Sequence, residues 1–140
     1  MSRAASEVRV GDALPTEHIS LDQGDLVRYA GASGDFNPLH WDADVAARVS
    51  PTGGVIAHGM LSLGHVSRMV TDWAGGPERV RELDAVFRAP APVGSTLALG
   101  GEVLAVDAET GLATLRVWAV LPDGAGVIDP RRSRAVVALS

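Results

Sequence analysis

Residues 29–42 read Tyr29-Ala30-Gly31-Ala32-Ser33-Gly34-Asp35-Phe36-Asn37-Pro38-Leu39-His40-Trp41-Asp42. They place one carboxylate, Asp35, five residues before one imidazole, His40. Gly34 permits a tight backbone and Pro38 fixes its own φ, so the loop that joins the two side chains is stiff. An isolated Asp or His more often caps a turn or packs in a core. Held together in such a loop, the two can share one water molecule, one accepting a proton while the other donates one.

A second motif, Ala57-His58-Gly59-Met60, begins about eighteen residues after His40. It is typical of the start of a helix, where backbone N–H groups have no acceptor within the helix. Such groups favour an oxygen that gains negative charge. An acid–base pair together with this kind of site indicates chemistry beside a carbonyl group.

The periodicity of the chain predicts helices first and strands afterwards. We expect helices over residues 22–30, 42–49 and 58–73, with Asp22 as an N-cap, Gly31 as a C-terminal stop and the last helix mostly buried. Turn residues then separate β-type runs over 80–88, 95–106, 112–120 and 131–139. This order predicts an α+β fold in which an antiparallel sheet wraps around the long central helix. Residues 1–140 are expected to form one domain.

Composition excludes several classes of chemistry. The chain has no cysteine, which removes disulfides and thiolate sites, and all twelve basic residues are arginine, which removes lysine Schiff-base chemistry. The net charge of −5 argues against binding to nucleic acid. The one basic cluster, Arg131-Arg132-Ser133-Arg134, is expected on an outward-facing strand, or near an acidic partner or a phosphate. No apolar run reaches the ~18 residues of a membrane helix, and a cytoplasmic location is expected.

The two motifs resemble those of MaoC-like proteins, the (R)-specific enoyl-thioester hydratases and dehydratases of the hot-dog fold. The recognisable frame is Tyr29-Ala30, Ser33-Gly34-Asp35, Asn37-Pro38-Leu39-His40 and Asp42, followed by Ala57-His58-Gly59-Met60-Leu61. The resemblance extends through residues 70–73 and 83–88 to 133–136, nearly the whole chain. It is strongest to the catalytic subunit of actinobacterial (3R)-hydroxyacyl dehydratases that act on acyl carrier protein.

The resemblance implies a role for individual residues. Asp35 and His40 would be the catalytic pair, and Asn37 would steady the Asp35 carboxylate. The N–H of Gly59 would bind the thioester carbonyl as it gains enolate character. His58 could line the site, although a structural role towards the neighbouring backbone is favoured. Ser62 either touches the thioester region or is a small residue of helix packing.

The remaining histidines and aromatic residues have structural interpretations. His65 lies two helical turns, or ~10 Å, beyond His58, too far for both to bind one metal ion. We therefore expect neither His65 nor His18 to be catalytic, and no metal or other cofactor. The aromatic residues are expected in the core or at a subunit contact: Tyr29, Phe36, Trp41, Trp73, Phe87 and Trp118.

The function implied is reversible hydration of a trans-2-enoyl thioester, or dehydration of its (3R)-hydroxy partner. The acyl group would arrive on coenzyme A or on acyl carrier protein. An open sheet edge predicts a dimer, formed either by two copies or with a related hot-dog subunit. Two alternatives remain, a hot-dog thioesterase and a non-catalytic subunit of a heterodimeric dehydratase.

Overall fold

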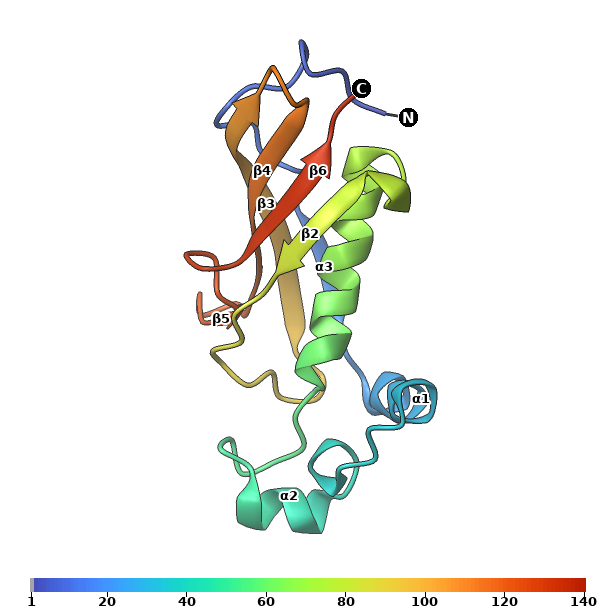
Figure 1. Cartoon of the computed structure of the whole chain (residues 1–140). Helices are drawn as coiled ribbons and strands as arrows, with labels where there is room; N and C mark the ends of the chain where they lie inside the picture. The colour runs from blue at the N-terminus through green and yellow to red at the C-terminus, as the bar shows by residue number, and fades with distance from the viewer. Residues whose placement is uncertain (1) are drawn as a thin grey trace.

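The computed structural model describes residues 2–140, which form one sheet packed against a long helix with two shorter helices at the end of that helix (Figure 1). The elements in chain order are β1 (Glu17–Ser20), α1 (Gln23–Ser33), a 3-10 turn (Pro38–His40), α2 (Ala43–Val49), α3 (Gly59–Ala74), a second 3-10 turn (Pro77–Arg79), β2 (Val80–Asp84), β3 (Thr96–Asp107), β4 (Leu112–Val120), β5 (Gly126–Ile128) and β6 (Arg134–Ala138).

The sheet is antiparallel throughout, in the order β1-β3-β4-β6-β2, with β5 paired to β4. Side chains of its central strand β4 alternate strictly, and four of them are fully buried: Ala113, Leu115, Val117 and Ala119. This alternation gives the sheet one apolar face, which α3 covers (Figure 1). The expected α+β hot-dog arrangement of a sheet around a central helix is confirmed.

Helix α3 buries the side of its surface that faces the sheet. Val66, Met69, Val70 and Trp73 are at most 7% exposed, and they recur at the three- and four-residue spacing of one helix face. The helix ends at Gly75, whose φ of 90° is in the left-handed region. The predicted helix over residues 58–73 therefore differs from α3 by one residue at each end.

Helix α1 is longer than the sequence predicted. A capping box between Asp22 and Asp25 starts it as expected, but Gly31 lies inside it. The helix continues to Ser33 and ends at Gly34, which adopts a φ of 77° and donates its N–H to the Ala30 carbonyl. Gly31 does not stop the helix because only Gly34 takes up the left-handed conformation of a helix end.

The predicted strands over residues 80–88 and 131–139 are both too long. β2 ends at Asp84 and β6 begins only at Arg134. Between these strands Ser133 turns its hydroxyl inward and accepts the N–H of Val86, and Val86 accepts the N–H of Asp129. These crossed contacts replace regular pairing, so Arg131 and Arg132 lie on a turn and not on a strand. The short strand β5 was not predicted, because its first residue was assigned to a turn.

The termini meet at one end of the molecule, and α1, α2 and their connections gather at the other, beside the first turn of α3 (Figure 1). Residues 22–58 therefore form an irregular cap over the N-terminal end of the central helix. Within residues 2–140 no helix combines the length and the apolar character needed to cross a bilayer.

Candidate active site

Asp35 and His40 face each other in the cap. The Asp35 Oδ2 lies 3.8 Å from the His40 Nε2. This distance is too long for a direct hydrogen bond but lets both atoms bind one water molecule. His40 is buried, whereas half of the Asp35 side chain (51%) is exposed. The two predicted catalytic groups therefore converge at the protein surface, with Asp35 on the solvent side.

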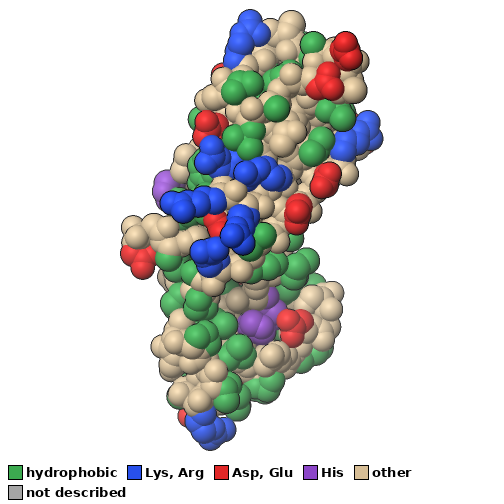
Figure 2. Space-filling view, turned by 60° about the vertical axis from the view of Figure 1, so that its left-hand side comes forward, with side chains coloured by type: hydrophobic (Ala, Val, Ile, Leu, Met, Phe, Trp, Pro, Cys, Tyr) green, Lys and Arg blue, Asp and Glu red, His purple; other side chains and the backbone are tan. Residues whose placement is uncertain are grey.

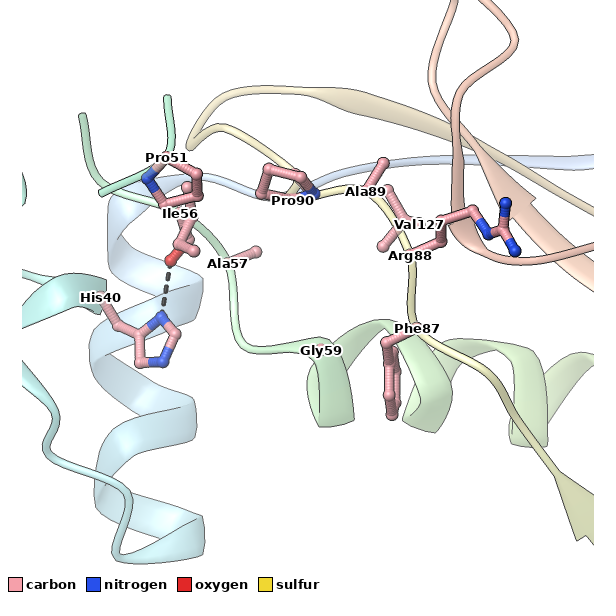
Figure 3. A pocket seen from close by; sticks show the side chains of 11 residues that line it. His40, Pro51, Ile56, Ala57, Gly59, Phe87, Arg88, Ala89, Pro90 and Val127 are labelled. Atoms are coloured by element: carbon pink, nitrogen blue, oxygen red, sulfur yellow. Dashed lines mark hydrogen bonds between the residues drawn. The ribbon is translucent and has the colours of Figure 1, made fainter. Parts of the chain in front are cut away.

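The imidazole of His40 is oriented by the backbone on its far side. Its Nδ1 lies 2.7 Å from the carbonyl oxygen of Ile56, as the dashed line in Figure 3 shows. A carbonyl only accepts, so Nδ1 carries the proton of the neutral ring and Nε2 keeps its lone pair. The backbone carbonyl of His40 in turn accepts a hydrogen bond from the Gln23 side chain, 2.9 Å away in α1. The nitrogen that faces Asp35 is thus a proton acceptor.

Asp35 is held by its own loop. Its Oδ1 accepts the backbone N–H of Asn37, and its backbone N–H donates to the Ser33 hydroxyl, both at 3.2 Å. The side chain of Asn37 caps the 3-10 turn by accepting the N–H of Leu39 at 3.1 Å. Asn37 therefore contacts the Asp35 carboxylate through its backbone, while its amide orders the turn that carries His40.

His58 joins these two groups from beneath. Its Nε2 donates to the backbone carbonyl of Asp35 at 3.2 Å, and its ring stacks on that of His40 with centroids 3.8 Å apart and planes 22° apart. The ring of Tyr29 meets it edge-on at 4.8 Å. Burial, aided by the nearby His40, holds the pKa of His58 below its ordinary value. His58 is therefore a neutral ring that packs against His40 and binds the backbone of Asp35.

A cavity of about 330 Å³ opens beside the pair (Figure 3). His40 and Gly59 lie on its wall, with Phe87 and residues 88–91 on the opposite side. Gly59 is the first residue of α3, so its N–H has no acceptor within the helix. A Cβ at position 59 would lie 3.0 Å from the Phe87 ring, so the absence of a side chain at Gly59 leaves room for that ring. The cavity therefore brings His40 and the start of α3 to one space, whereas Asp35 lies next to His40 and does not line the cavity.

Ser62, His65 and His18 lie apart from the cavity wall. Ser62, one turn further along α3, is fully buried, and its hydroxyl has no hydrogen-bond partner within residues 2–140. It does not line the cavity, so its contact with a substrate stays a prediction. His65 lines a separate surface cavity with Leu61, Gly64 and Arg68. His18 lies on β1, at the sheet edge.

The ligand-type atoms of Asp35, His40 and His58 lie within 4.8 Å of one another. A shared metal ion fits them poorly, because the lone pairs of imidazole lie in the ring plane and these two rings are nearly parallel. Two of the four imidazole nitrogens also already contact backbone carbonyl groups. The arrangement suits proton transfer better than metal binding.

Three residues that shape the site carried no sequence signal for it. Ile56 contributes only its carbonyl and Gln23 reaches His40 from another helix, so neither role is visible in a side-chain pattern. Phe87 was expected in the core or at a subunit contact; it is 45% exposed and lines the cavity, so it is not a core residue, and the subunit contact stays a prediction. Phe36 and Trp41 are exposed as well, so the core interpretation is wrong for them.

The sheet, the central helix and the converging side chains define a hot-dog protein with an Asp–His pair near the start of its helix. Comparison with known families is in agreement, since the MaoC like domain matches residues 6–115. This chain belongs to the MaoC-like domain family.

Three named relatives are similar to this chain over part of its length. The chain is 32% identical over 108 residues to the 3-oxo-4,17-pregnadiene-20-carboxyl-CoA hydratase beta subunit of Mycobacterium tuberculosis, covering 77% of this chain and 81% of that one. It is 31% identical to the (R)-specific enoyl-CoA hydratase of Rhodospirillum rubrum, over 69% of this chain and 67% of the relative. Against the 3-hydroxybutyryl-CoA dehydratase of Methylorubrum extorquens the identity is 34%, but the match spans only 53% of that relative's length.

Solved structures show the same fold. The (R)-hydratase from A. caviae involved in PHA biosynthesis superimposes with a TM-score of 0.84 at 27% identity, covering 95% of this chain and 98% of that one. A MaoC-like dehydratase gives a TM-score of 0.92 at 34% identity over 99% of this chain, but only 43% of the other. A third, the ChsH1-ChsH2 complex from Mycobacterium tuberculosis, has a TM-score of 0.80 at 28% identity.

Proposed function

We propose that this protein is a hydro-lyase that adds water reversibly to a trans-2-enoyl thioester and yields the (3R)-hydroxyacyl thioester. The observation that carries this proposal is the 3.8 Å separation of Asp35 Oδ2 and His40 Nε2, of which His40 lines a cavity together with the first residue of α3. Hydration of a polarised double bond needs one held water, one proton acceptor and one proton donor on the same face. The pair would hold the water molecule, accept one of its protons and donate a proton to the substrate.

In the hydration direction the water molecule would be held between the two side chains. As its oxygen bonds to Cβ of the substrate, one water proton passes to the pair, and the lone pair on the His40 Nε2 can receive it. A proton returns from the pair to Cα, so that H and OH have been added across the double bond and both side chains end as they began. The proton count belongs to the pair as a unit.

The start of α3 would stabilise the thioester oxygen. When water attacks Cβ, electron density moves towards the carbonyl, and the N–H of Gly59, a residue of the cavity wall, would meet that charge. Removing one such donor typically costs ~10²–10³ in rate. The helix dipole adds to the effect because it is positive at this end.

The names of the relatives support coenzyme A as the carrier, since three of them are CoA hydratases or dehydratases. Acyl carrier protein remains the alternative carrier. The likeness to a two-component complex supports a partnered form, so we propose that the active protein is a homodimer or a heterodimer with a related hot-dog subunit.

The test is a direct assay of hydration. Purified protein, alone and with any hot-dog subunit encoded beside it, is given trans-2-enoyl-CoA of several chain lengths, and the loss of enoyl-thioester absorbance is followed. We expect loss of absorbance without release of free thiol, and chiral analysis should show the (3R) product. Release of thiol would favour the thioesterase alternative, and no change in any mixture would favour a non-catalytic subunit.

A further inference from the structure

A second cavity lies beside the active-site cavity and is cationic. Its volume is about 400 Å³, and Arg88, Arg131 and Arg132 line it together with the carboxylate of Asp129. Figure 2 shows arginine side chains gathered just above the hollow in which histidine and an acidic side chain are visible. The whole chain carries a net charge of −5, so this cluster is a local reversal of sign.

Asp129 positions one of the arginines without neutralising the group. Its side chain is only 7% exposed, and its Oδ2 lies 3.0 Å from the Nε of Arg88. Its Oδ1 accepts the backbone N–H of Arg131 at 2.8 Å, so both carboxylate oxygens are occupied. The Arg88 side chain stays 62% exposed, and within residues 2–140 its two Nη groups have no hydrogen-bond acceptor. The outer edge of its guanidinium is therefore available to an anion.

Arg131 and Arg132 are neighbours in the chain, and within residues 2–140 neither has an acidic partner. In residues 2–140 no carboxylate oxygen lies within 4.0 Å of a guanidinium nitrogen of Arg131 or Arg132. By contrast, Arg28, Arg68 and Arg116 each pair with an acidic side chain elsewhere on the surface. Three arginines and one buried carboxylate line this cavity, so its lining carries an excess of positive charge.

The two cavities share one lining residue, Arg88. Its backbone region lines the active-site cavity with His40 and Gly59, while the residue also lines the cationic cavity. Figure 3 shows its guanidinium pointing away from His40, on the far side of Val127. A ligand whose reacting group lies at His40 and whose opposite end is anionic would therefore place that end among the arginines.

We propose that the cationic cavity binds the phosphate groups at the nucleotide end of a coenzyme A thioester. This inference rests on the proposed function, which places an acyl thioester in the neighbouring cavity. Arginine is suited to phosphate because its planar fork donates two parallel hydrogen bonds. A hollow favours a compact phosphorylated nucleotide over the convex acidic surface of a carrier protein. The substrate class is then acyl-CoA, which Arg88, Arg131 and Arg132 recognise through its phosphate groups.

The kinetic test compares two thioesters of the same enoyl group, one on coenzyme A and one on N-acetylcysteamine, which has no phosphate. The measured quantity is the ratio of their kcat/KM values. Arg131→Gln with Arg132→Gln should lower this ratio by about tenfold or more, because two charge-assisted hydrogen bonds are lost. Arg9→Gln with Arg48→Gln removes the same net charge away from the cavity and should keep the ratio of the unaltered protein.

A binding test separates this inference from the proposed reaction. Adenosine 3′,5′-bisphosphate is titrated into the full chain by calorimetry at two salt concentrations. We expect binding that weakens with salt and is lost in the Arg131→Gln, Arg132→Gln variant but kept in the Arg9→Gln, Arg48→Gln control. This result would support the phosphate site even if no hydration were seen.

Two outcomes would overturn the inference. The first is an unchanged thioester ratio and unchanged nucleotide binding in the Arg131→Gln, Arg132→Gln variant. The second is a variant that slows only enoyl-acyl carrier protein and leaves the coenzyme A thioester unaffected, which would assign the arginines to a protein carrier. Neither outcome would affect the assignment of Asp35 and His40.

Discussion

The body of the molecule and the cap over residues 22–58 are stabilised by different forces. The body buries continuous apolar surface between α3 and the sheet, where Leu99, Leu115 and Val66 are fully buried. The cap contributes few buried apolar side chains, and it exposes Val27, Phe36, Trp41 and Val49. Polar contacts define it instead, through the caps of its helices and the bonds to His40. Apolar packing thus stabilises the body, and hydrogen bonds fix the positions of Asp35 and His40 in the cap.

The comparison predicts that changes in the cap reduce activity far more than stability. The largest effect should come from Asp35→Asn and His40→Asn. The asparagine oxygen at position 35 can still accept the N–H of Asn37, and the amide at position 40 can still donate to Ile56 as Nδ1 does. Each variant keeps its structural bond and loses its proton chemistry, so kcat should fall by about 10²–10⁴.

The measurement is kcat beside the free energy of unfolding in urea. Asp44→Asn, at an exposed acid in α2, is the control for loss of a carboxylate and should keep full turnover. Turnover at the unaltered rate in Asp35→Asn or His40→Asn would contradict the acid–base assignment. A large loss of unfolding free energy in either would contradict the division between cap and body.

The body should respond in the opposite way. Leu115→Ala removes a fully buried side chain at the centre of the sheet, and we expect the free energy of unfolding to fall by about 2–5 kcal/mol. The folded fraction should keep its kcat within about threefold, since no cap residue loses a hydrogen bond and ~0.7 kcal/mol is the corresponding change in barrier. Val10→Ala, at a side chain 66% exposed, is the matched control and should change stability little.

The sequence predicted the body well because its signals are periodic. Strict alternation in residues 112–120 and helical spacing in 58–73 both reflect which side chains face the core, and packing enforces those faces. The ends of the strands were less predictable. Ser133 interrupts pairing by accepting the N–H of Val86, a contact between residues 47 positions apart that no local pattern records.

The site was predictable only where side chains carry the chemistry. The convergence of Asp35 and His40 was predictable because both lie in a stiff loop whose motif resembles that of MaoC-like proteins. Ile56 acts through its carbonyl, and every residue has one, so nothing in the sequence distinguishes it. The Arg131-Arg132 pair was visible as a charge cluster, but its place beside Arg88 depends on the turn formed at Asp129.

His58 is a positioning residue between the two regions, and two substitutions separate its contacts. His58→Gln can keep the donor to the Asp35 carbonyl and loses the ring stacked on His40, whereas His58→Phe keeps a ring and loses the donor. If the hydrogen bond places Asp35, kcat should fall by about tenfold in His58→Phe, equivalent to ~1.4 kcal/mol, and by less in His58→Gln.

The split between kcat and KM checks this role. A positioning effect lowers kcat while KM changes little, because His58 does not line the cavity. A general loss of structure would instead lower the fraction of active protein in both variants alike. A greater loss of kcat in His58→Gln than in His58→Phe would show that the stacked ring matters more than the donor.

The smallest expected effect is the response of stability to pH. Burial lowers the pKa of His58, and burial with the nearby Arg68 lowers that of His65. The unfolded chain therefore takes up protons at these positions near pH 6.5 while the folded chain does not. Stability due to neutral His58 and His65 is fully present above that pH and is lost as the pH falls towards their folded pKa values.

The slope of unfolding free energy against pH separates the two regions once more. It should approach at most about 1.4 kcal/mol per pH unit for each proton taken up on unfolding. Replacing His65 by Gln removes one titrating group from α3 in the body, and His58→Gln removes one from the cap, so each should flatten the curve below pH 6.5. His18→Gln, at an exposed histidine, controls for loss of an imidazole.

Turnover should respond to acid before stability does. Because the ring of His58 lies against that of His40, protonation of His58 would disturb His40 and Asp35 before the body unfolds. Turnover should therefore decline at a higher pH than the folded signal. Coincident loss of turnover and of folded signal on acidification would show that cap and body respond as one unit.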